Sequence, residues 1–474
     1  MAEHGHNRFE ARVAKAVSDG FLSKALRRAQ DTFGPKRAAV IESLPDWQGW
    51  RDHTAAVRKH TIAHLDHYLR QFIENVEARG ARVYLAADAR EAREYIVGLA
   101  CEKGVRSIVK SKSMVTEEIH LNQALEQQGM EVVETDLGEY IIQLAKEPPS
   151  HIIAPAIHKT KEQVAEIFSA LAGRKLSSQP EELTAFAREV LREKFLRADM
   201  GISGCNFGVA STGSLVLVSN EGNARLSTTL PRVHVAVMGM ERLVPDLESL
   251  DPILTVLPRS ATGQKATTYL TVLSGPRREG DKDGPEELHV VIVDNGRSGI
   301  LGTAYQSVLQ CIRCGACLNA CPVYRQIGGH SYGSVYPGPI GAVLSPLLAG
   351  MEKHRALPFA SSLCGACQEV CPARVPLTDL LVELRRDMVC RGMSTRRERL
   401  AFLGFGLLAK SPRLFGWALK GAYRALAPWA KNGRIERGPG PLSGWTQSRN
   451  FPQPPRESFR SWWAARKSGP EQGE

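Results

Sequence analysis

The sequence predicts an α/β protein with a parallel sheet, followed by a mainly helical cysteine-rich module and a basic C-terminal extension. Short β-type runs alternate with helical segments between residues 82 and 300, which is typical of a parallel sheet. Eight of the ten cysteines fall between residues 311 and 390. We therefore expect four regions: an N-terminal helical segment (1–64), an α/β domain (65–302), a cysteine module (303–390) and the extension (391–474).

The N-terminal region has helix-forming composition. Residues 9–26 are rich in Ala, Lys and Arg, and residues 53–78 carry apolar side chains at helical spacing. His60, His64 and His67 share one face of this second helix. We expect a solvated face there rather than a metal site.

Within the α/β region the expected strands and helices alternate. Asp88 and Glu91 form a capping-box pattern for one helix, and Gly104 stands where a C-terminal cap is expected. Thr116 is the expected cap of the next helix, which ends near Gly129. Helices are also expected over 160–174 and 181–197, and a hairpin over 201–219. The expected strands are 83–85, 108–109, 132–133, 152–153, 233–239, 268–273 and 289–293, with a surface loop over 275–287.

Composition excludes several classes of protein. The 474 residues allow two to four domains, and 43% hydrophobic content is ordinary for a chain that buries a core. The longest clean apolar stretch, residues 401–409, is far shorter than the ~20 residues that span a bilayer. The first residues carry no secretory signal pattern, so a cytoplasmic protein is expected.

The first cysteine run is the strongest signal. Cys311, Cys314, Cys317 and Cys321, followed by Pro322, have the spacing of a bacterial ferredoxin motif. Three thiolates on one tight loop can bind three corners of a cubane, while the fourth cysteine binds a different cluster.

The second run repeats the last three cysteine positions of this motif with Cys364, Cys367 and Cys371, followed by Pro372. Ser361 stands in the first position. In two-cluster ferredoxins the last cysteine of each run binds the cluster held by the other run. This crossover rule assigns Cys311, Cys314, Cys317 and Cys371 to one [4Fe-4S] cluster. It gives Cys321, Cys364 and Cys367 to a second, whose fourth ligand is left open between Ser361, Cys390, water and substrate. A [3Fe-4S] cluster is the other alternative for this site. Zinc also binds paired cysteines, but the doubled Cys-Pro motif favours iron and sulfur.

The remaining cysteines have simpler explanations. Cys101 and Cys205 are expected to be buried structural thiols, and Cys390 to lie in a core at the end of a helix. No Gly-x-Gly-x-x-Gly follows a strand, which suggests that a partner completes the chemistry.

Four residues are candidates for contact with substrate. Thr212, Ser214 and Arg225 fit an anion site, because small residues expose backbone N–H groups and Arg binds carboxylates; a tight hairpin with a surface turn explains them equally well. His330 lies in a Gly-rich segment between the cysteine runs, either a cover over a site or a structural loop.

The charge of the chain lies in its extension. Residues 391–474 hold 16 Lys and Arg against 5 Asp and Glu, so the other residues, with 45 of each kind, are neutral. Thr395 and Glu398 are expected to cap a helix from 400 to 429. We expect the extension to bind an acidic partner or an anionic membrane surface, and rank nucleic acid below both. The alternative is that this helix packs into the core of the cysteine module.

The doubled cysteine run, the segment from Gly329 to Ala342 and the segment from Asn206 to Ser214 together resemble the lactate utilisation protein B family. The resemblance implies a CoA-transferase and sugar-phosphate-isomerase-like domain followed by a two-cluster ferredoxin-like module. It implies two partner subunits and the oxidation of L-lactate to pyruvate in the cytoplasm.

Two functions follow from these expectations. The first is an electron-transfer component of an L-lactate-oxidising complex that passes electrons to an unidentified acceptor. The second is a self-sufficient enzyme, similar to a hydroxy-acid dehydratase, whose open cluster binds substrate directly. Turnover by the isolated chain separates them.

Overall fold

The structure is a computed structural model that describes residues 2–440, 442–447 and 449–467. The chain divides into two compact units at Met388 and Val389. Within the described residues, no helix is both long enough and apolar enough to cross a membrane.

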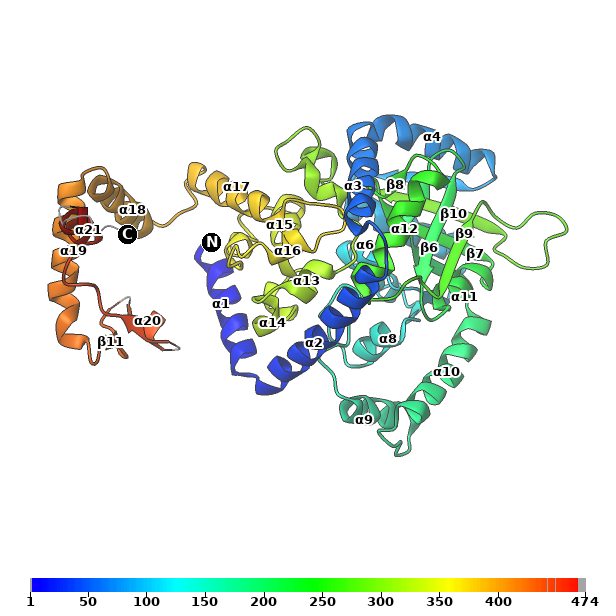
Figure 1. Ribbon diagram of the computed structural model, residues 1–474. Coiled ribbons are helices and arrows are strands. Elements are labelled where there is room, and N and C mark those ends of the chain that lie inside the picture. The colour runs from blue at the N-terminus through cyan, green and yellow to red at the C-terminus, as the bar shows by residue number, and fades with distance from the viewer. Residues whose placement is uncertain (1, 441, 448, 468–474) are drawn as a thin grey trace. The chain divides into compact units, whose positions relative to one another are not determined.

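The first unit contains most of the elements labelled in Figure 1. Its strands are β1 Arg82–Ala86, β2 Ser107–Lys110, β3 Glu131–Glu134, β4 Met200–Gly204, β5 Phe207–Val209, β6 Ser214–Ser219, β7 Val233–Gly239, β8 Leu243–Val244, β9 Tyr269–Leu273 and β10 Glu287–Val293. Its helices are α1 Ala2–Ser18, α2 Gly20–Glu42, α3 Trp47–Ala63, α4 Leu65–Ala78, α5 Ala89–Glu102, α6 Met114–Glu118, α7 Leu121–Glu126, α8 Leu137–Leu144, α9 Lys161–Ala172, α10 Pro180–Arg197, α11 Asn223–Thr229, α12 Leu247–Ala261, α13 Ala316–Ala320, α14 Tyr324–Ile327, α15 Gly338–Ala349, α16 Ala366–Glu369 and α17 Leu377–Cys390, which ends just past the division.

A six-stranded sheet in the order β1-β10-β7-β4-β2-β3 forms the centre of this unit, and every adjacent pair is parallel. Parallel strands are buried on both faces, which explains their continuous apolar runs. Alternate side chains of β7 and β10 enter different cores: Val235 and Val291 pack with helices α5 and α7, whereas Ala236 and Val290 pack with α4. The prediction of an α/β fold with a parallel sheet is confirmed.

A second sheet, in the order β8-β5-β6-β9, lies against α4. The hairpin predicted over 201–219 is therefore divided. β4 joins the parallel sheet, whereas β5 and β6 pair antiparallel in the second sheet. The other face of this second sheet packs with α2, α3 and α12 in the core that also contains the cysteine-rich region.

The N-terminal helices lie beside the cysteine-rich helices, as Figure 1 shows for α1, α2, α13 and α14. Gln30 of α2 donates to the carbonyls of Leu318 at 2.9 Å and Cys321 at 3.3 Å. Arg12 of α1 donates to the Ser331 carbonyl at 3.0 Å. These helices therefore form part of the wall of the cysteine-rich region.

Some local predictions are wrong. Ile152 and Ile153 form bends rather than a strand, because Pro149 and Pro155 flank them and a proline cannot donate to a ladder. The helix predicted from Thr116 begins after Ser113, whose hydroxyl caps it, and breaks at His120, which has a φ of 52°. Cys101 is exposed rather than buried.

The second unit has helices α18 Arg396–Ala409, α19 Pro412–Leu426, α20 Leu442–Thr446 and α21 Phe459–Lys467, and a short antiparallel pair, β11 Arg434–Ile435 and β12 Phe451–Pro452. The predicted cap at Thr395 is confirmed, since its side chain accepts from the Glu398 amide at 3.2 Å. The predicted single helix over 400–429 is divided, because Ser411 caps a new helix that starts with Pro412. No side chain of α18 or α19 is buried.

Candidate metal centre

The two cysteine runs fold into the same local shape. Arg313 and Leu363, each immediately before a cysteine, have φ values of 59° and 53°, and Gly315 and Gly365, each immediately after it, have 72° and 84°. Each run then enters a short helix, α13 or α16. Residues in the left-handed region turn the chain sharply, so both runs wrap their cysteines around a small volume.

Backbone amides point at the sulfur atoms. The amides of Arg313, Tyr324 and Val375 each donate at 3.4 Å, to the sulfurs of Cys311, Cys321 and Cys371 respectively. An N–H donor stabilises a thiolate rather than a thiol, and hydrogen bonds to cluster sulfurs are one means by which proteins adjust cluster potentials.

One group of thiols gathers around Cys317. Burial raises the pKa of this thiol well above its usual range, and the neighbouring Cys311, Cys314 and Cys371 raise it further. The pKa of Cys371 is raised to about 11 by burial and by Cys311. Thiols from both runs are therefore close enough to act on one another.

A second group gathers around Cys367. Burial, together with the neighbouring Cys321 and Cys364, raises the pKa of Cys367 to about 11. Burial likewise raises the pKa of Cys321, and Cys364 adds to it. Among the described residues, no three His, Cys, Asp or Glu side chains form a group suited to a single metal ion.

Among the buried donors beside the thiols that have no acceptor within the described chain, two lie on different elements. One is the hydroxyl of Tyr332, which is 1% exposed and lies near Cys321 and Cys367. The other is Nε of Arg37, near Cys314. Buried donors are nearly always paired, so these two fit an anionic group held by the thiols.

Several buried arginines near the thiols also lack a carboxylate partner among the described residues. Arg51 donates to the Cys371 carbonyl at 2.8 Å and the Glu369 carbonyl at 2.6 Å. Arg58 is fully buried and donates only to carbonyls, and burial lowers its pKa to about 9. Buried charges are normally paired, so this excess of positive charge fits a negatively charged cluster. The residues present fit a thiolate-bound iron–sulfur group.

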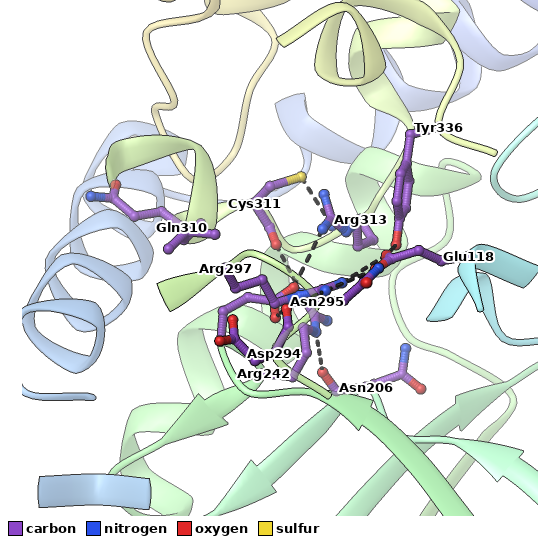
Figure 2. Close-up of polar contacts among 12 residues, drawn as sticks. Glu118, Asn206, Arg242, Asp294, Asn295, Arg297, Gln310, Cys311, Arg313 and Tyr336 are labelled. Atoms are coloured by element: carbon purple, nitrogen blue, oxygen red, sulfur yellow. Dashed lines mark hydrogen bonds and ion pairs between the residues drawn. The ribbon is translucent and has the colours of Figure 1, made fainter. Parts of the chain in front are cut away.

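A network of ion pairs joins the sheet to the first cysteine loop (Figure 2). Arg297, after β10, binds Glu118 of α6 at 2.8 Å and Glu241 at 2.7 Å. Glu241 also binds Arg313 at 3.3 Å, and these arginines together lower its pKa to about 2 against the effect of burial. The Tyr336 hydroxyl donates to Glu118 at 2.5 Å, and the Arg313 guanidinium lies over the Tyr336 ring, 4.7 Å from its centroid.

Arg242 connects the same network to the cysteine loop. It is 5% exposed and donates through Nη1 to the Cys311 carbonyl at 2.8 Å and through Nε to the Asn206 carbonyl at 2.9 Å. Figure 2 shows Arg242 and Arg313 close to Cys311. The loop after β7 therefore helps to position the first cysteine run.

A cavity of about 420 Å³ lies beside this network. It is within the ordinary size range of small-molecule sites, about 300–1,000 Å³. Cys314 is part of its wall, and none of Cys321, Cys364 and Cys367 is. The other polar residues around it include Ser111, Lys112, Ser113, Asp136, Asn206, Glu221, Asn223, Glu241, Arg242, Arg313 and Tyr336.

The structure does not bring the four substrate candidates together, and none of them lines this cavity. The Thr212 hydroxyl donates to Ser214, which bonds to Ser274, in the turn before β6. Arg225 is exposed on α11, beyond the opposite end of β6. His330 bonds to the Pro148 carbonyl at 2.8 Å. Their contact with substrate stays a prediction.

The predictions for the remaining cysteines and for the histidines have different outcomes. Cys205 is partly buried between β4 and β5, and burial raises its pKa to about 12. Cys390 is exposed, so the expectation that it lies in a core is wrong; apolar spacing in a helix does not fix what covers its last turn. His60, His64 and His67 are exposed, and His64 lies between α3 and α4 rather than inside one helix.

The sequence reasoning missed the residues that connect the two regions: Arg37, Arg51, Arg58, Lys112, Glu118, Glu241, Arg242, Arg297 and Arg313. Each is an ordinary charged residue in a local pattern, and only Arg313, inside the first cysteine run, carried a signal of its position.

Comparison with family models finds three matches along the chain. Residues 69–293 match the LUD domain, residues 307–375 match the 4Fe-4S dicluster domain, and residues 390–468 match the C-terminal region of lactate utilisation protein B. The cysteine-rich region is thus similar to domains that hold two iron–sulfur clusters.

Curated relatives cover nearly all of the chain. Lactate utilization protein B of Shouchella clausii is 54% identical, with 97% of both chains covered. That of Geobacillus kaustophilus is also 54% identical over 97% of both chains, and that of Bacillus subtilis is 51% identical over 98% of this chain and 97% of its own. The chain belongs to the lactate utilization protein B family.

Membership in the lactate utilization protein B family confirms the resemblance drawn from the sequence. It makes the chain an iron–sulfur protein of lactate utilization, with a LUD domain, a 4Fe-4S dicluster region and a C-terminal domain. A crystal structure of a DUF162 family protein from Deinococcus radiodurans covers 48% of this chain and 98% of its own at 18% identity, with a TM-score of 0.28. That likeness supports no argument.

Proposed function

We propose that this chain is the iron–sulfur electron-transfer component of a multi-subunit complex that oxidises L-lactate to pyruvate. The observation that carries the proposal is the division of seven thiols into two groups, one of which contributes Cys314 to the wall of a cavity of the α/β domain. Oxidation of lactate to pyruvate releases two electrons and two protons. The clusters, when bound, supply sites that take up and release these electrons one at a time.

We assign Cys311, Cys314, Cys317 and Cys371 to the first cluster. The electrostatic influence of these thiols on one another supports this grouping. The backbone amides that donate to Cys311 and Cys371 keep these ligands in the thiolate form. Arg51 balances negative charge at this site.

We assign Cys321, Cys364 and Cys367 to the second cluster, supported by the effect of each thiol on its neighbours. The fourth ligand is open between Ser361, Cys390, water and substrate, and [3Fe-4S] is the alternative cluster. Cys364 is exposed, so this cluster has a side through which electrons can leave for a partner.

The partners in this proposal are two other lactate-utilisation subunits and an electron acceptor. We expect the α/β domain to be CoA-transferase and sugar-phosphate-isomerase-like, and the protein to act in the cytoplasm. The basic extension binds an acidic partner or an anionic membrane surface. The extension carries large apolar side chains that its own unit leaves exposed, with Phe402 at 68% and Trp417 at 72%.

The second candidate is a hydroxy-acid dehydratase-like enzyme that acts through the open site of the second cluster. The exposure of Cys364 and the missing fourth cysteine favour it. Against it, the large cavity borders Cys314 of the first group, where every iron already has a thiolate. A dehydratase would turn over as an isolated chain and release no electrons.

The deciding experiment is anaerobic co-purification with the two partner subunits, followed by iron and sulfide analysis and by addition of L-lactate under EPR. We expect about seven to eight iron atoms, matching sulfide, and reduction of a cluster only when the partners are present. Zinc without sulfide, or loss of water from a hydroxy acid by the isolated chain, would overturn the proposal.

A further inference from the structure

The cavity beside Cys314 lies where several strands of the parallel sheet end. Ser111, Lys112 and Ser113 follow β2, and Gly204 ends β4. Glu241 and Arg242 follow β7. In open α/β sheets ligands bind at the carboxyl ends of the strands, where the loops diverge. The position alone makes this cavity a candidate ligand site of the α/β domain.

The wall next to Cys314 carries more positive than negative charge, because Arg242 and Arg313 share one neighbouring carboxylate, Glu241. Nη1 of Arg313 is buried and has no hydrogen-bond partner within the described chain. Arg242 is almost fully buried and bonds to carbonyls, with no carboxylate at ion-pair distance among the described residues. A buried cation without a counter-charge is costly, so an anion is the expected occupant.

Lys112 adds a third cation to the cavity. Its ammonium group is buried without a hydrogen bond, and the carboxylate nearest to it is Glu139 at 3.3 Å. Burial raises the pKa of Glu139 to about 7, so this carboxylate carries only part of its charge near neutral pH. Lys112 therefore has donor capacity to spare for a ligand.

The carboxylates that face the cavity are already engaged. Asp136 accepts from the Glu139 amide at 3.0 Å, and Glu221 accepts from the Leu137 amide at 3.0 Å. Glu241 is held by Arg297 and Arg313. Acidic and basic side chains are equally numerous on the wall, so the part of the cavity suited to an anion is the one formed by Arg242 and Arg313 beside Cys314.

We propose that this cavity binds a short 2-hydroxy or 2-oxo monocarboxylate, with the carboxylate on Arg313 and Arg242 and Lys112 donating to the oxygen at carbon 2. The chemical class of this ligand rests on the proposed function, whereas the cationic cavity does not. Planar guanidinium groups match the geometry of a carboxylate. The bound acid lies beside Cys314.

The cavity is larger than a three-carbon acid requires. At ~30 Å³ per water molecule, 420 Å³ corresponds to about fourteen waters, whereas pyruvate has six non-hydrogen atoms. Apolar side chains of Ile152, Leu217 and Leu257 form part of the wall. We therefore expect acids with a longer apolar side chain, such as 2-oxobutyrate, to bind at least as well as pyruvate.

The test is calorimetric binding of pyruvate to the anaerobically purified holoprotein. Lys112→Gln should weaken binding at least tenfold while leaving iron content and visible absorption unchanged. The matched control is Lys103→Gln. Lys103 has an ion pair with Glu287 at 2.6 Å. It precedes β2 and therefore lies at the amino ends of the strands, away from the cavity at their carboxyl ends. This control should bind pyruvate as the unsubstituted protein does.

A second variant and a second readout complete the test. Arg313→Lys keeps the charge but loses the planar fork, and should weaken binding with the clusters present. In the dithionite-reduced protein, paramagnetic broadening of the pyruvate methyl resonance should be strong and should disappear with Lys112→Gln. Equal weakening by Lys103→Gln, or binding without broadening, would overturn the assignment.

Failure of this site and failure of the proposed function have different signatures. If the complete complex oxidises lactate while Lys112→Gln binds pyruvate normally, the site is wrong and the function stands. If pyruvate binds as described but lactate never reduces the clusters in the presence of the partners, the site stands and the function is wrong.

Discussion

Ser361 in the second cysteine run has the local geometry that Cys311 has in the first. The Ser361 hydroxyl accepts a hydrogen bond from the Leu363 amide at 3.1 Å, and the Cys311 sulfur accepts one from the Arg313 amide at 3.4 Å. Leu363 and Arg313 have φ values of 53° and 59°. The Ser361 hydroxyl oxygen therefore has the same place in its run as the Cys311 sulfur has in the first run.

This equivalence predicts that Ser361→Cys completes the second cluster. On exposure to air the unsubstituted protein should give a [3Fe-4S] EPR signal, because an iron without a thiolate is the most easily lost. Ser361→Cys should suppress that signal severalfold. Cys390→Ser is the control and should behave as the unsubstituted protein does; loss of iron in that variant would make Cys390 the ligand instead.

The ligand assignment predicts the effect of removing one thiolate from the first group. Cys314→Ser should lower the iron content by up to about four atoms and leave the absorption of the second cluster. Cys205→Ser, which removes a thiol outside both groups, should keep all iron. Unchanged iron in Cys314→Ser would contradict the assignment, as would equal loss in both variants.

The arginines near the first cluster predict its reduction potential. Arg51→Gln removes a positive charge beside Cys371 and should lower the midpoint potential by roughly 40–100 mV, the size of a partly screened charge interaction of about 1–2 kcal/mol. Arg51→Lys keeps the charge and loses part of the hydrogen bonding, so its potential should stay near that of the unsubstituted protein. Redox titration followed by EPR measures both. Equal shifts in the two variants would indicate a structural effect rather than an electrostatic one.

The Arg297 network predicts a large effect on stability. Arg297 is fully buried and binds both Glu118 and Glu241, so Arg297→Met leaves two buried carboxylates without a main counter-charge. We expect a loss of about 3–5 kcal/mol in the free energy of unfolding, measured by denaturant titration. Arg277→Met, at an exposed ion pair with Glu286, should cost less than about 1 kcal/mol.

The same network gives the expected pH dependence. The pKa of Glu241 is lowered to about 2, mainly by Arg297 and Arg313 against burial. A carboxylate with a lowered pKa stabilises the fold fully above its ordinary pKa of about 4.5 and progressively less as the pH falls toward 2. Arg297→Met should reduce this acid-dependent loss. An identical pH profile would contradict the role of the pair.

The basic extension predicts salt-dependent association. A chain that ends at Gly392 should keep its iron but bind the partner subunits or anionic vesicles more weakly. Binding by the full chain should decline as salt rises, because exposed charges are screened over about 8–10 Å. Pull-down and vesicle co-sedimentation at low and high salt measure this. Loss of iron on truncation, or association that does not weaken as salt rises, would count against a binding role for the extension.

The sequence by itself determined the features that depend on short spacings. The spacing within each cysteine run is local, and it predicts the iron–sulfur ligands, since one loop can supply three thiolates. The alternation of strands and helices predicted the parallel sheet, because both periodicities are properties of short segments. The cap at Thr395 was visible for the same reason.

Only the tertiary structure decided what distant segments do to one another. Lys112, Arg242 and Arg313 meet around one cavity because β2, β7 and the cysteine loop converge there. The candidates Thr212 and Arg225 are separated because β6 lies between them. Cys101 and Cys390 are exposed although their helices are partly apolar. Burial and charge pairing depend on which surfaces come together in the fold. A local sequence pattern does not specify which distant residues will contact it.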